Sequence, residues 1–298
     1  MKIPRLAAFW KKRRAPLAPF GGQGFKFYLG VLALLLTGFL AGFYLFFPTS
    51  ALQQRLELEI AARTPLDARI EAVSLLFPPG LQAEGIRLAG GRPPTEFTVN
   101  LVKLTPLWRT LTSSNPGFAF HAEVLGGQVD GSVRKSGSLA AQLQNLTFSA
   151  PVGEAFPVRL TGRLGKGEFA GALPLQAATE TRLNLGFDQF EISGLSALGL
   201  ASDTLALGTV SLVGTGRATA LKIDRLSASG GSLEVTGDGT VMLATPLDRS
   251  RLNLNLVLRP GRQLDKSLAD LLELFAQAGP DGSFSLRLTG SLRQVSFQ

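Results

Sequence analysis

The side chains that could form a catalytic or metal-binding site are few and are spread along the chain. His121 is the only histidine, and there is no cysteine. A single imidazole without cysteine partners needs carboxylates to hold a metal, and no His-x-x-Glu-His spacing surrounds it. Counting by twos along a strand, His121 lies on the opposite face from Phe118, Phe120 and Val124. We therefore interpret His121 as an ordinary strand residue and predict neither a metal site nor a cofactor.

One short motif resembles a serine nucleophile with its lysine base. Ser132-Val133-Arg134-Lys135 has the Ser-x-x-Lys spacing that places the two side chains one helical turn apart in serine acyl-enzymes. Here the tetrad runs from a strand into the turn Ser136-Gly137, and in a strand this spacing puts the side chains on opposite faces. No Gly-x-Ser-x-Gly sequence offers another serine. The sequence thus predicts no catalytic residue, and we expect a protein that is not an enzyme.

Glycine pairs and scattered carboxylates also have simpler explanations than a ligand site. Gly165-Lys166-Gly167 and Gly214-Thr215-Gly216 lack the further residues of a phosphate-binding loop, and neither opens a helix, so we predict turns. Asp130, Glu234 and Asp238 are dispersed, as on the solvated face of a sheet.

The element that organises the chain is an apolar stretch near the N-terminus. Phe25 to Phe47 covers 23 residues (47 − 25 + 1) with a single charge, Lys26. As a helix it would reach about 34 Å, enough to cross the hydrocarbon core of a bilayer. A signal peptide cleaved near Thr49–Ala51 is the alternative, but its apolar region is usually about 7 to 15 residues. We therefore expect an uncleaved anchor.

The flanking charges predict which way the anchor faces. Seven basic residues and no acidic residue precede the apolar core, and basic segments remain cytoplasmic: Lys2, Arg5, Lys11, Lys12, Arg13, Arg14 and Lys26. This places the rest of the chain outside the cytoplasm, which is the periplasm of a Gram-negative cell. We predict a cytoplasmic tail over 1–24, a transmembrane helix over 25–47, a periplasmic stalk helix over 48–66 and a periplasmic β domain over 67–298.

The same charges explain the basic composition without nucleic acid. The net charge is +8, of which the tail supplies +7. From Phe27 onward, the chain has 23 basic residues (30 − 7) and 22 acidic residues, so this part is close to neutral. We therefore predict no nucleic-acid partner, and interpret the high pI as a sign of membrane topology.

From Asp67 onward the hydrophobic period is two, the period of β-strands. Leucines at 252, 254, 256 and 258 alternate with Asn253, Asn255 and Val257. Roughly 12 to 14 such segments, separated by glycine-rich turns, predict a mainly β, mostly antiparallel sheet with one aliphatic and one polar face.

Few helices are available to cover the aliphatic face. We predict a stalk helix over Ser50–Thr64, a short helix over Pro106–Thr112, and an amphipathic helix over Gln263–Ala278 that stops at Gly279-Pro280. Two or three helices cannot cover so large a sheet unless it also curls on itself. A curled sheet with an internal apolar groove is therefore expected.

Two pairs of short blocks recur along the chain. Val124–Gly131 is echoed by Ala228–Val235, and Leu160–Leu164 by Leu288–Leu292. We interpret both pairs as turns. They reflect either an internal repeat or the common use of Gly-Gly and Thr-Gly in hairpins.

The order of several blocks resembles a known family. Phe77-Pro78-Pro79-Gly80-Leu81 and Glu84–Leu88 follow the anchor, then come Pro106-Leu107-Trp108 and Gly126-Gly127, and the chain closes with Asp281–Leu286 and Leu288–Leu292. This order resembles the AsmA-like periplasmic proteins, and most closely the type II secretion system protein N (GspN) family.

The resemblance implies a function that composition does not. Likeness to the secretion family implies a non-enzymatic accessory subunit in the inner membrane, with other secretion components as partners. Likeness to the wider AsmA-like group implies instead a lipid-binding or lipid-transfer protein, with phospholipid in an apolar groove. In either case we expect a partner to pair with a sheet edge, for which Gly282–Gln298 is the candidate.

Overall fold

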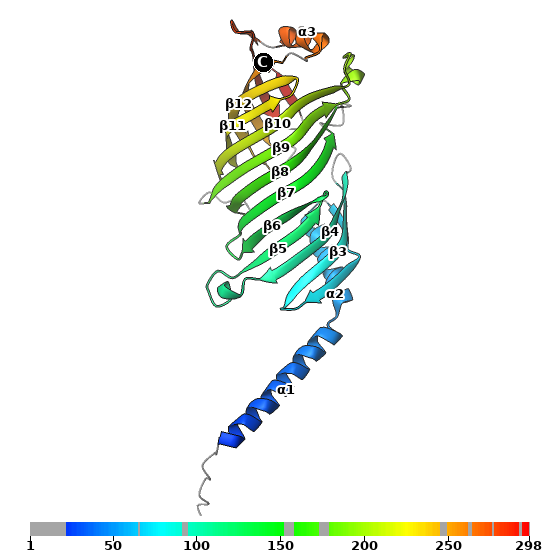
Figure 1. Cartoon of the computed structure of the whole chain (residues 1–298), viewed down its shortest axis with the longest axis vertical. Coiled ribbons are helices and arrows are strands. Elements are labelled where there is room, and N and C mark those ends of the chain that lie inside the picture. Colours follow the sequence, from blue (N-terminus) through cyan, green and yellow to red (C-terminus); the bar gives the residue numbers. More distant parts are fainter. Residues whose placement is uncertain are drawn as a thin grey trace, which may run out of the picture. The chain divides into compact units, whose positions relative to one another are not determined.

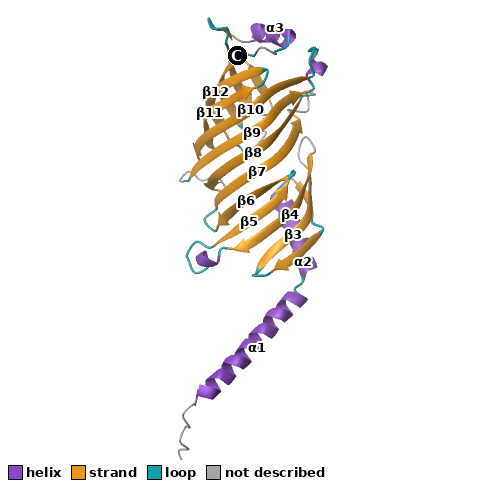
Figure 2. Cartoon of the chain, viewed as in Figure 1, coloured by secondary structure: helices purple, strands orange, loops and turns teal. Residues whose placement is uncertain are grey.

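The chain forms two compact units, Met1–Pro48 and Thr49–Gln298 (Figures 1 and 2). A computed structural model describes residues 22–64, 66–90, 95–151, 158–172, 179–244, 249–261, 264–275, 277–291 and 294–297. The basic tail predicted to set the topology lies mostly outside these residues, since only Lys26 of its seven charges is described.

The first unit contains a single apolar helix, α1 (Gly22–Phe46). Its segment Lys26–Phe46 has a mean hydropathy of 2.2, and none of it is buried. A core helix of a soluble protein would be buried by its neighbours, whereas a membrane span or a signal sequence would not. The helix is thus long and apolar enough to cross a bilayer.

The second unit is built on one antiparallel sheet of sixteen strands that does not close into a barrel. The strand order is β1-β3-β4-β5-β6-β7-β8-β9-β10-β11-β12-β13-β15-β14, with β2 also paired to β3 and β16 also paired to β15. This confirms the mainly β, antiparallel fold. The strands are β1 Leu66–Arg69, β2 Ala72–Leu76, β3 Gly80–Gly90, β4 Thr95–Pro106, β5 Gly117–Val124, β6 Gly127–Arg134, β7 Ser138–Pro151, β8 Arg159–Ala172, β9 Glu180–Ser193, β10 Thr204–Arg217, β11 Ala220–Gly230, β12 Leu233–Met242, β13 Arg251–Pro260, β14 Gln277–Ala278, β15 Phe284–Ser291 and β16 Gln294–Phe297.

The helices of this unit are few and short. They are α2 (Thr49–Arg63), the 3-10 helices η1 (Trp108–Thr110) and η2 (Leu195–Leu198), and α3 (Lys266–Phe275). The predicted extension of α3 to Ala278 is wrong, because Gln277 and Ala278 pair with Ser285 and Phe284 as β14. Gln277 and Ala278 therefore belong to a strand, and α3 ends at Phe275, before Gly279 and Pro280.

Two glycine motifs predicted as turns lie inside strands instead. Gly165–Gly167 is part of β8 and Gly214–Gly216 is part of β10. The blocks Leu160–Leu164 and Leu288–Leu292 are also not turns, since their described residues lie in β8 and β15. For Gly162, the reason why glycine occurs inside a strand is local crowding, because a Cβ there would lie 3.1 Å from the ring of Phe148. Glycine at such a position makes room for a large side chain of a neighbouring strand.

The other repeated block does form hairpin turns. Leu125 and Gly126 have φ values of 53° and 73°, the left-handed geometry that a two-residue hairpin turn requires. The matching glycines, Gly230 and Gly231, lie where β11 turns into β12. The prediction of turns is confirmed for this pair of blocks.

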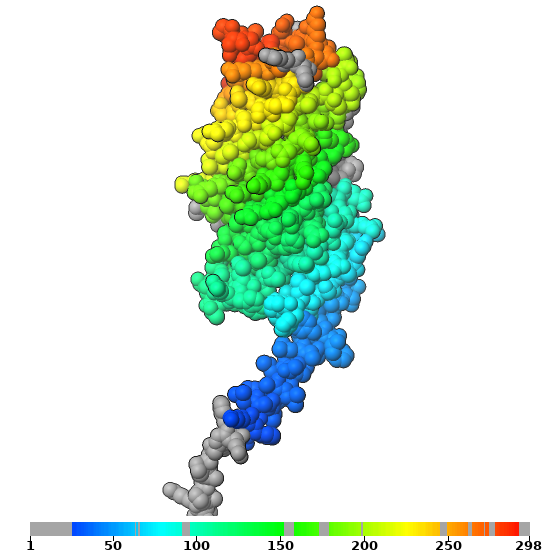
Figure 3. All heavy atoms as spheres, viewed as in Figure 1, coloured from blue at the N-terminus to red at the C-terminus, as the bar shows by residue number. Residues whose placement is uncertain are grey.

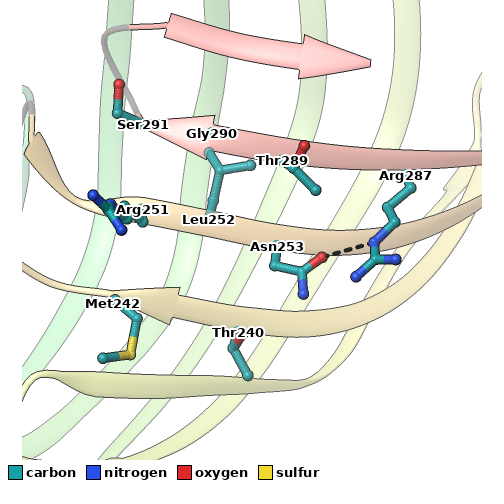
Figure 4. Close-up of a pocket in the computed structure, with 9 residues that line it drawn as sticks. All are labelled: Thr240, Met242, Arg251, Leu252, Asn253, Arg287, Thr289, Gly290 and Ser291. Carbon is teal, nitrogen blue, oxygen red and sulfur yellow. Dashed lines mark hydrogen bonds between the residues drawn. The ribbon is translucent and has the colours of Figure 1, made fainter. Parts of the chain in front are cut away.

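The sheet curls at its C-terminal half and encloses a hydrophobic core there. In Figure 1 the last strands pass behind β10–β12, and Figure 4 shows strands from the middle of the sheet behind β12, β13 and β15. The buried core joins residues from η2, β10 to β13 and β15, and Leu264, Leu268 and Leu272 pack against it from α3 and its approach. Figure 3 shows the sequence colours running in order across the outer surface of this unit.

Candidate functional site

The most extensive feature of the sheet is one apolar face. Residues paired across an antiparallel ladder lie on the same face, so the register traces that face from strand to strand. One row crosses thirteen strands and contains only apolar residues and glycine: Val73, Ala83, Val102, Ala122, Val129, Leu143, Gly167, Leu185, Leu212, Leu226, Gly237, Leu256 and Leu286.

The next row along the strands lies on the other face and is polar. It contains Gln82, Lys103, His121, Asp130, Gln142, Glu168 and Asn184. The predicted division into an aliphatic and a polar face is therefore confirmed.

Burial of the apolar face is uneven along the sheet. Among the described side chains, no apolar residue between Val73 and Leu146 is buried, although this stretch supplies β3 to β6 and half of β7. Burial of this face resumes at Leu146 and Leu164, which are 8% and 5% exposed. The apolar residues on this poorly covered part are Leu81, Ala83, Ile86, Leu88, Phe97, Val99, Val102, Leu104, Phe118, Phe120, Ala122, Val124, Val129, Val133, Leu139, Ala141 and Leu143.

An aromatic cluster marks where the better packed region starts. The rings of Phe148, Phe187 and Phe190 have centroids 5.5 to 5.8 Å apart in edge-to-face and tilted arrangements. Such pairs add to the burial of their surface. This cluster, together with Gly162 beneath it, fixes the spacing of β7, β8 and β9.

One edge of the sheet is covered by α2. The edge is divided between β1 and β2, and Ile70 between them has no ladder partner. Gln53 Nε2 donates to the Ile70 carbonyl oxygen at 2.6 Å, and the Ile70 N–H donates to Glu57 Oε1 at 2.8 Å. Ile70 is 5% exposed, so α2 satisfies both polar groups of a buried backbone.

The opposite edge differs from the one expected over Gly282–Gln298. β15 pairs with β13 on one side, and with β14 and β16 on the other. The interaction edge assigned to this whole segment is thus wrong for β15, which lies inside the sheet. The outer strands are β14 and the four residues of β16.

His121 lies on the polar face, as expected. Its Nδ1 lies 2.7 Å from Asp130 Oδ1, its cross-strand partner, and its Nε2 lies 3.8 Å from Glu123 Oε1. Within the described residues, no group of three or more His, Cys, Asp or Glu side chains could hold a metal ion. His121 and the two carboxylates form a partly exposed polar cluster.

The Ser132 to Lys135 motif is divided between a strand and a turn, as predicted. Ser132 pairs with Ala119 and Ala140 inside the sheet, whereas β6 ends at Arg134. The Lys135 N–H donates to the Pro116 carbonyl oxygen at 2.8 Å in the turn that follows. The motif therefore lacks the helical geometry of a serine acyl-enzyme.

A cavity of about 790 Å³ lies on the polar face over β12, β13 and β15 (Figure 4). Arg287 Nε donates to Asn253 Oδ1 at 3.0 Å, which leaves the two terminal nitrogens of the guanidinium for other acceptors. Arg251 also lines the cavity, and neither arginine forms an ion pair with any described residue. The two guanidinium groups lie apart along the ladder, since Arg251 pairs with Ser291 and Arg287 pairs with Asn255. Only the register of β13 and β15 brings them to one cavity, and no sequence motif indicates this.

Three of the carboxylates with a lowered pKa cap turns or helix ends. The Ser267 hydroxyl and then the Ser267 N–H lower the pKa of Asp265 just before α3. The Ser196 and Ser283 hydroxyls and N–H groups lower the pKa values of Asp203 and Asp281 in the same way. Hydrogen bonds to the charged form explain each shift, and these carboxylates therefore have structural roles.

Comparison with known proteins found no matching family model, curated protein or solved structure. The functional argument therefore depends on the residues and geometry described above.

Proposed function

We propose that this protein is a non-enzymatic accessory subunit of a bacterial type II secretion system, anchored in the inner membrane with its sheet in the periplasm. The observation that carries the proposal is the order of elements. An apolar helix is followed by α2, a β2–β3 hairpin with Phe77-Pro78-Pro79 at its tip, η1 at Trp108, the Gly126 turn, and finally α3 with β15. This order matches the blocks that resemble the secretion family.

A clean deletion tests this function. Loss of the gene is expected to reduce export of secreted proteins across the outer membrane, and the full-length chain is expected to restore it. The tagged full chain should co-purify with other secretion components from detergent-solubilised membranes. Unchanged export in the deletion strain, together with no co-purifying component, would contradict the proposal.

A second candidate function is lipid binding, and the poorly covered apolar face of β3 to β6 favours it. Strands β3 to β6 are four consecutive strands of the sheet, and none of their described apolar side chains is buried. Burying an acyl chain there would gain about 0.8 kcal/mol per methylene. A protein that uses this face for lipid would leave it open in the absence of its ligand.

Native mass spectrometry of the full chain tests the lipid candidate with a matched pair of variants. Val102 and Lys103 are neighbours on β4 and lie on the apolar and polar face, respectively. Val102→Glu is expected to remove bound phospholipid because it places a charge on the apolar face, whereas Lys103→Glu should retain it. Equal lipid occupancy in the two variants would eliminate this candidate.

A further inference from the structure

One end of the sheet, at β2 to β6, carries an exposed apolar and basic surface. It consists of the tip of the β2–β3 hairpin (77–80), the loop from β4 through η1 into β5 (107–118), and the β6–β7 turn (134–138). We call this surface the η1 end.

The three segments of the η1 end are neighbours in space. A Cβ on Gly80 would lie 2.7 Å from the Leu104 carbonyl oxygen and 3.2 Å from Thr105 Cγ2, so the hairpin tip runs beside the end of β4. Pro106 pairs with Phe118, and Phe118 pairs with Val133. The end therefore presents a surface at least four strands wide.

Hydrogen bonds hold the loops of the η1 end in place. Thr110 Oγ1 donates to the Leu107 carbonyl oxygen at 2.8 Å and accepts from the Gly117 N–H at 3.2 Å. Asn115 Nδ2 donates to Ser136 Oγ at 3.2 Å, and the Ser136 N–H donates to Asn115 Oδ1 at 2.9 Å. The surface is thus a structured part of the domain. In Figures 1 and 3 the η1 loop, coloured teal-green, projects beside β5.

Large apolar side chains are exposed here. Phe77 is 82% exposed, Trp108 51%, Phe118 48% and Leu111 44%. Elsewhere on the described strands and turns of the sheet, the large exposed side chains Leu125, Met242 and Val257 lie on separate hairpins or strands. A grouping of this kind is typical of a surface that binds another protein or a membrane.

The charges of the same segments are all positive. Arg109, Arg134 and Lys135 are exposed, and none of them forms an ion pair with any residue of the described ranges. The segments 77–80, 107–118 and 134–138 contain no acidic residue. Aromatic and aliphatic side chains among unpaired basic ones match the interface of a bilayer with anionic lipids.

We propose that the η1 end is a membrane-contact surface that inserts Trp108 and its apolar neighbours at the interface of an anionic bilayer. The connection to α1 makes a bilayer the most suitable occupant. Only Phe47 and Pro48 separate α1 from α2, and α2 is about 22 Å long. A domain joined so closely to an apolar helix stays within reach of the membrane that holds this helix. The inference goes beyond the secretion function, since it concerns a lipid surface and not a protein partner.

Tryptophan fluorescence of the full chain tests this inference directly. The protein has two tryptophans, Trp10 and Trp108, so Trp10→Phe leaves Trp108 as the only reporter. The variant is reconstituted in vesicles of phosphatidylcholine and phosphatidylglycerol, with or without brominated acyl chains. Trp108 emission is expected to shift to the blue and to be quenched by the brominated lipid.

A reporter at the other end of β5 provides the control. Leu125 is 43% exposed in the β5–β6 turn, and Leu125→Trp in a Trp10→Phe/Trp108→Phe chain should escape quenching. No quenching of Trp108, or equal quenching at both positions, would overturn the inference. Either result is independent of the deletion phenotype that tests the secretion function.

Charge variants test the basic part of the surface. Arg109→Glu/Lys135→Glu should abolish the quenching of Trp108 in anionic vesicles, because like charges then meet the headgroups. Lys166→Glu/Arg225→Glu makes the same change in net charge on β8 and β11, away from the η1 end, and should leave the quenching unchanged. Equal effects of the two pairs would contradict a specific contact, provided that circular dichroism shows the same β content in all variants.

Discussion

At the scale of single residues, glycines on the apolar face determine how closely neighbouring strands and rings approach. A Cβ on Gly131 would lie 2.4 Å from the Ala140 carbonyl oxygen and 2.5 Å from the Phe120 ring. The backbone oxygen cannot move away without disturbing the ladder between β6 and β7. By contrast, a Cβ on Gly186 would meet only the Lys166 carbonyl oxygen, at 3.6 Å.

These distances predict opposite results for the same substitution. Gly131→Ala should destabilise the sheet by about 1–3 kcal/mol, since overpacking forces the backbone to shift. Gly186→Ala should change stability by less than about 0.5 kcal/mol. Denaturant unfolding of both variants in the same detergent, followed by circular dichroism, measures the difference. Similar midpoints would show that β6 and β7 are not packed as described.

Asp265 provides a second prediction at this scale. Its Oδ1 accepts from the Ser267 N–H at 2.9 Å and from Ser267 Oγ at 2.7 Å at the start of α3. Asp265→Ala should lower the melting temperature by a few degrees, because an N-cap is lost. Asp238→Ala, at an exposed position on the polar face of β12, is the matched control and should not lower it.

The pH dependence of this effect has a defined sign. The Ser267 hydroxyl, followed by the Ser267 N–H, holds the pKa of Asp265 below its ordinary value of 3.8. A lowered pKa in the folded state stabilises the fold above the ordinary value, and this stabilisation is lost as the pH falls through the folded-state pKa. The melting temperatures of wild type and Asp265→Ala should therefore differ at neutral pH and converge in acid. A difference that persists in acid would show that the charge of Asp265 is not involved.

At the scale of elements, α2 replaces the missing strand partner at one sheet edge. The ladder is interrupted at Ile70, and two side chains of α2 satisfy its N–H and carbonyl groups. An edge completed by side chains of a helix is not available for pairing with another chain. The short strands β14 and β16 form the opposite edge.

This arrangement predicts a strong dependence on two polar residues of α2. Gln53→Ala or Glu57→Ala leaves one buried backbone group unsatisfied, which costs about 1–3 kcal/mol. Gln54→Ala on the exposed side of the same helix should be nearly neutral. Denaturant unfolding compares the three variants. An effect of Gln54→Ala as large as that of Glu57→Ala would mean that helix propensity, and not the contact with Ile70, is being measured.

The elements also show which structural features sequence patterns predict. Strands such as β13 follow directly from the alternation of Leu252, Leu254, Leu256 and Leu258, because the period of two is a local property. β14 has only two residues, too few for any period. The strand position of Gly162 depends on rings of other strands, and the cavity beside Arg251 depends on register, so neither follows from local sequence.

At the scale of the whole molecule, an apolar helix is joined to a sheet domain in which most apolar side chains of β3 to β6 are only half-buried. The proposed functions require that this domain lie outside the cytoplasm. The charge distribution predicts this orientation, since seven basic residues and no acidic residue precede the apolar core. A chain with reversed orientation could contact neither periplasmic secretion components nor lipids in transit through the periplasm.

The absence of cysteine from the sequence allows a direct test of this orientation. Ala8→Cys places a single thiol in the basic tail, and Ser229→Cys places one at an exposed position of β11. In cells with a permeabilised outer membrane, a membrane-impermeant maleimide should label Ser229→Cys and should label Ala8→Cys only after the inner membrane is also opened. Labelling of Ala8→Cys in intact spheroplasts would contradict the predicted topology. A labelled Ser229→Cys chain that begins near Thr49 would instead show that the apolar segment is a cleaved signal peptide, because an anchor must remain attached to the domain that it holds.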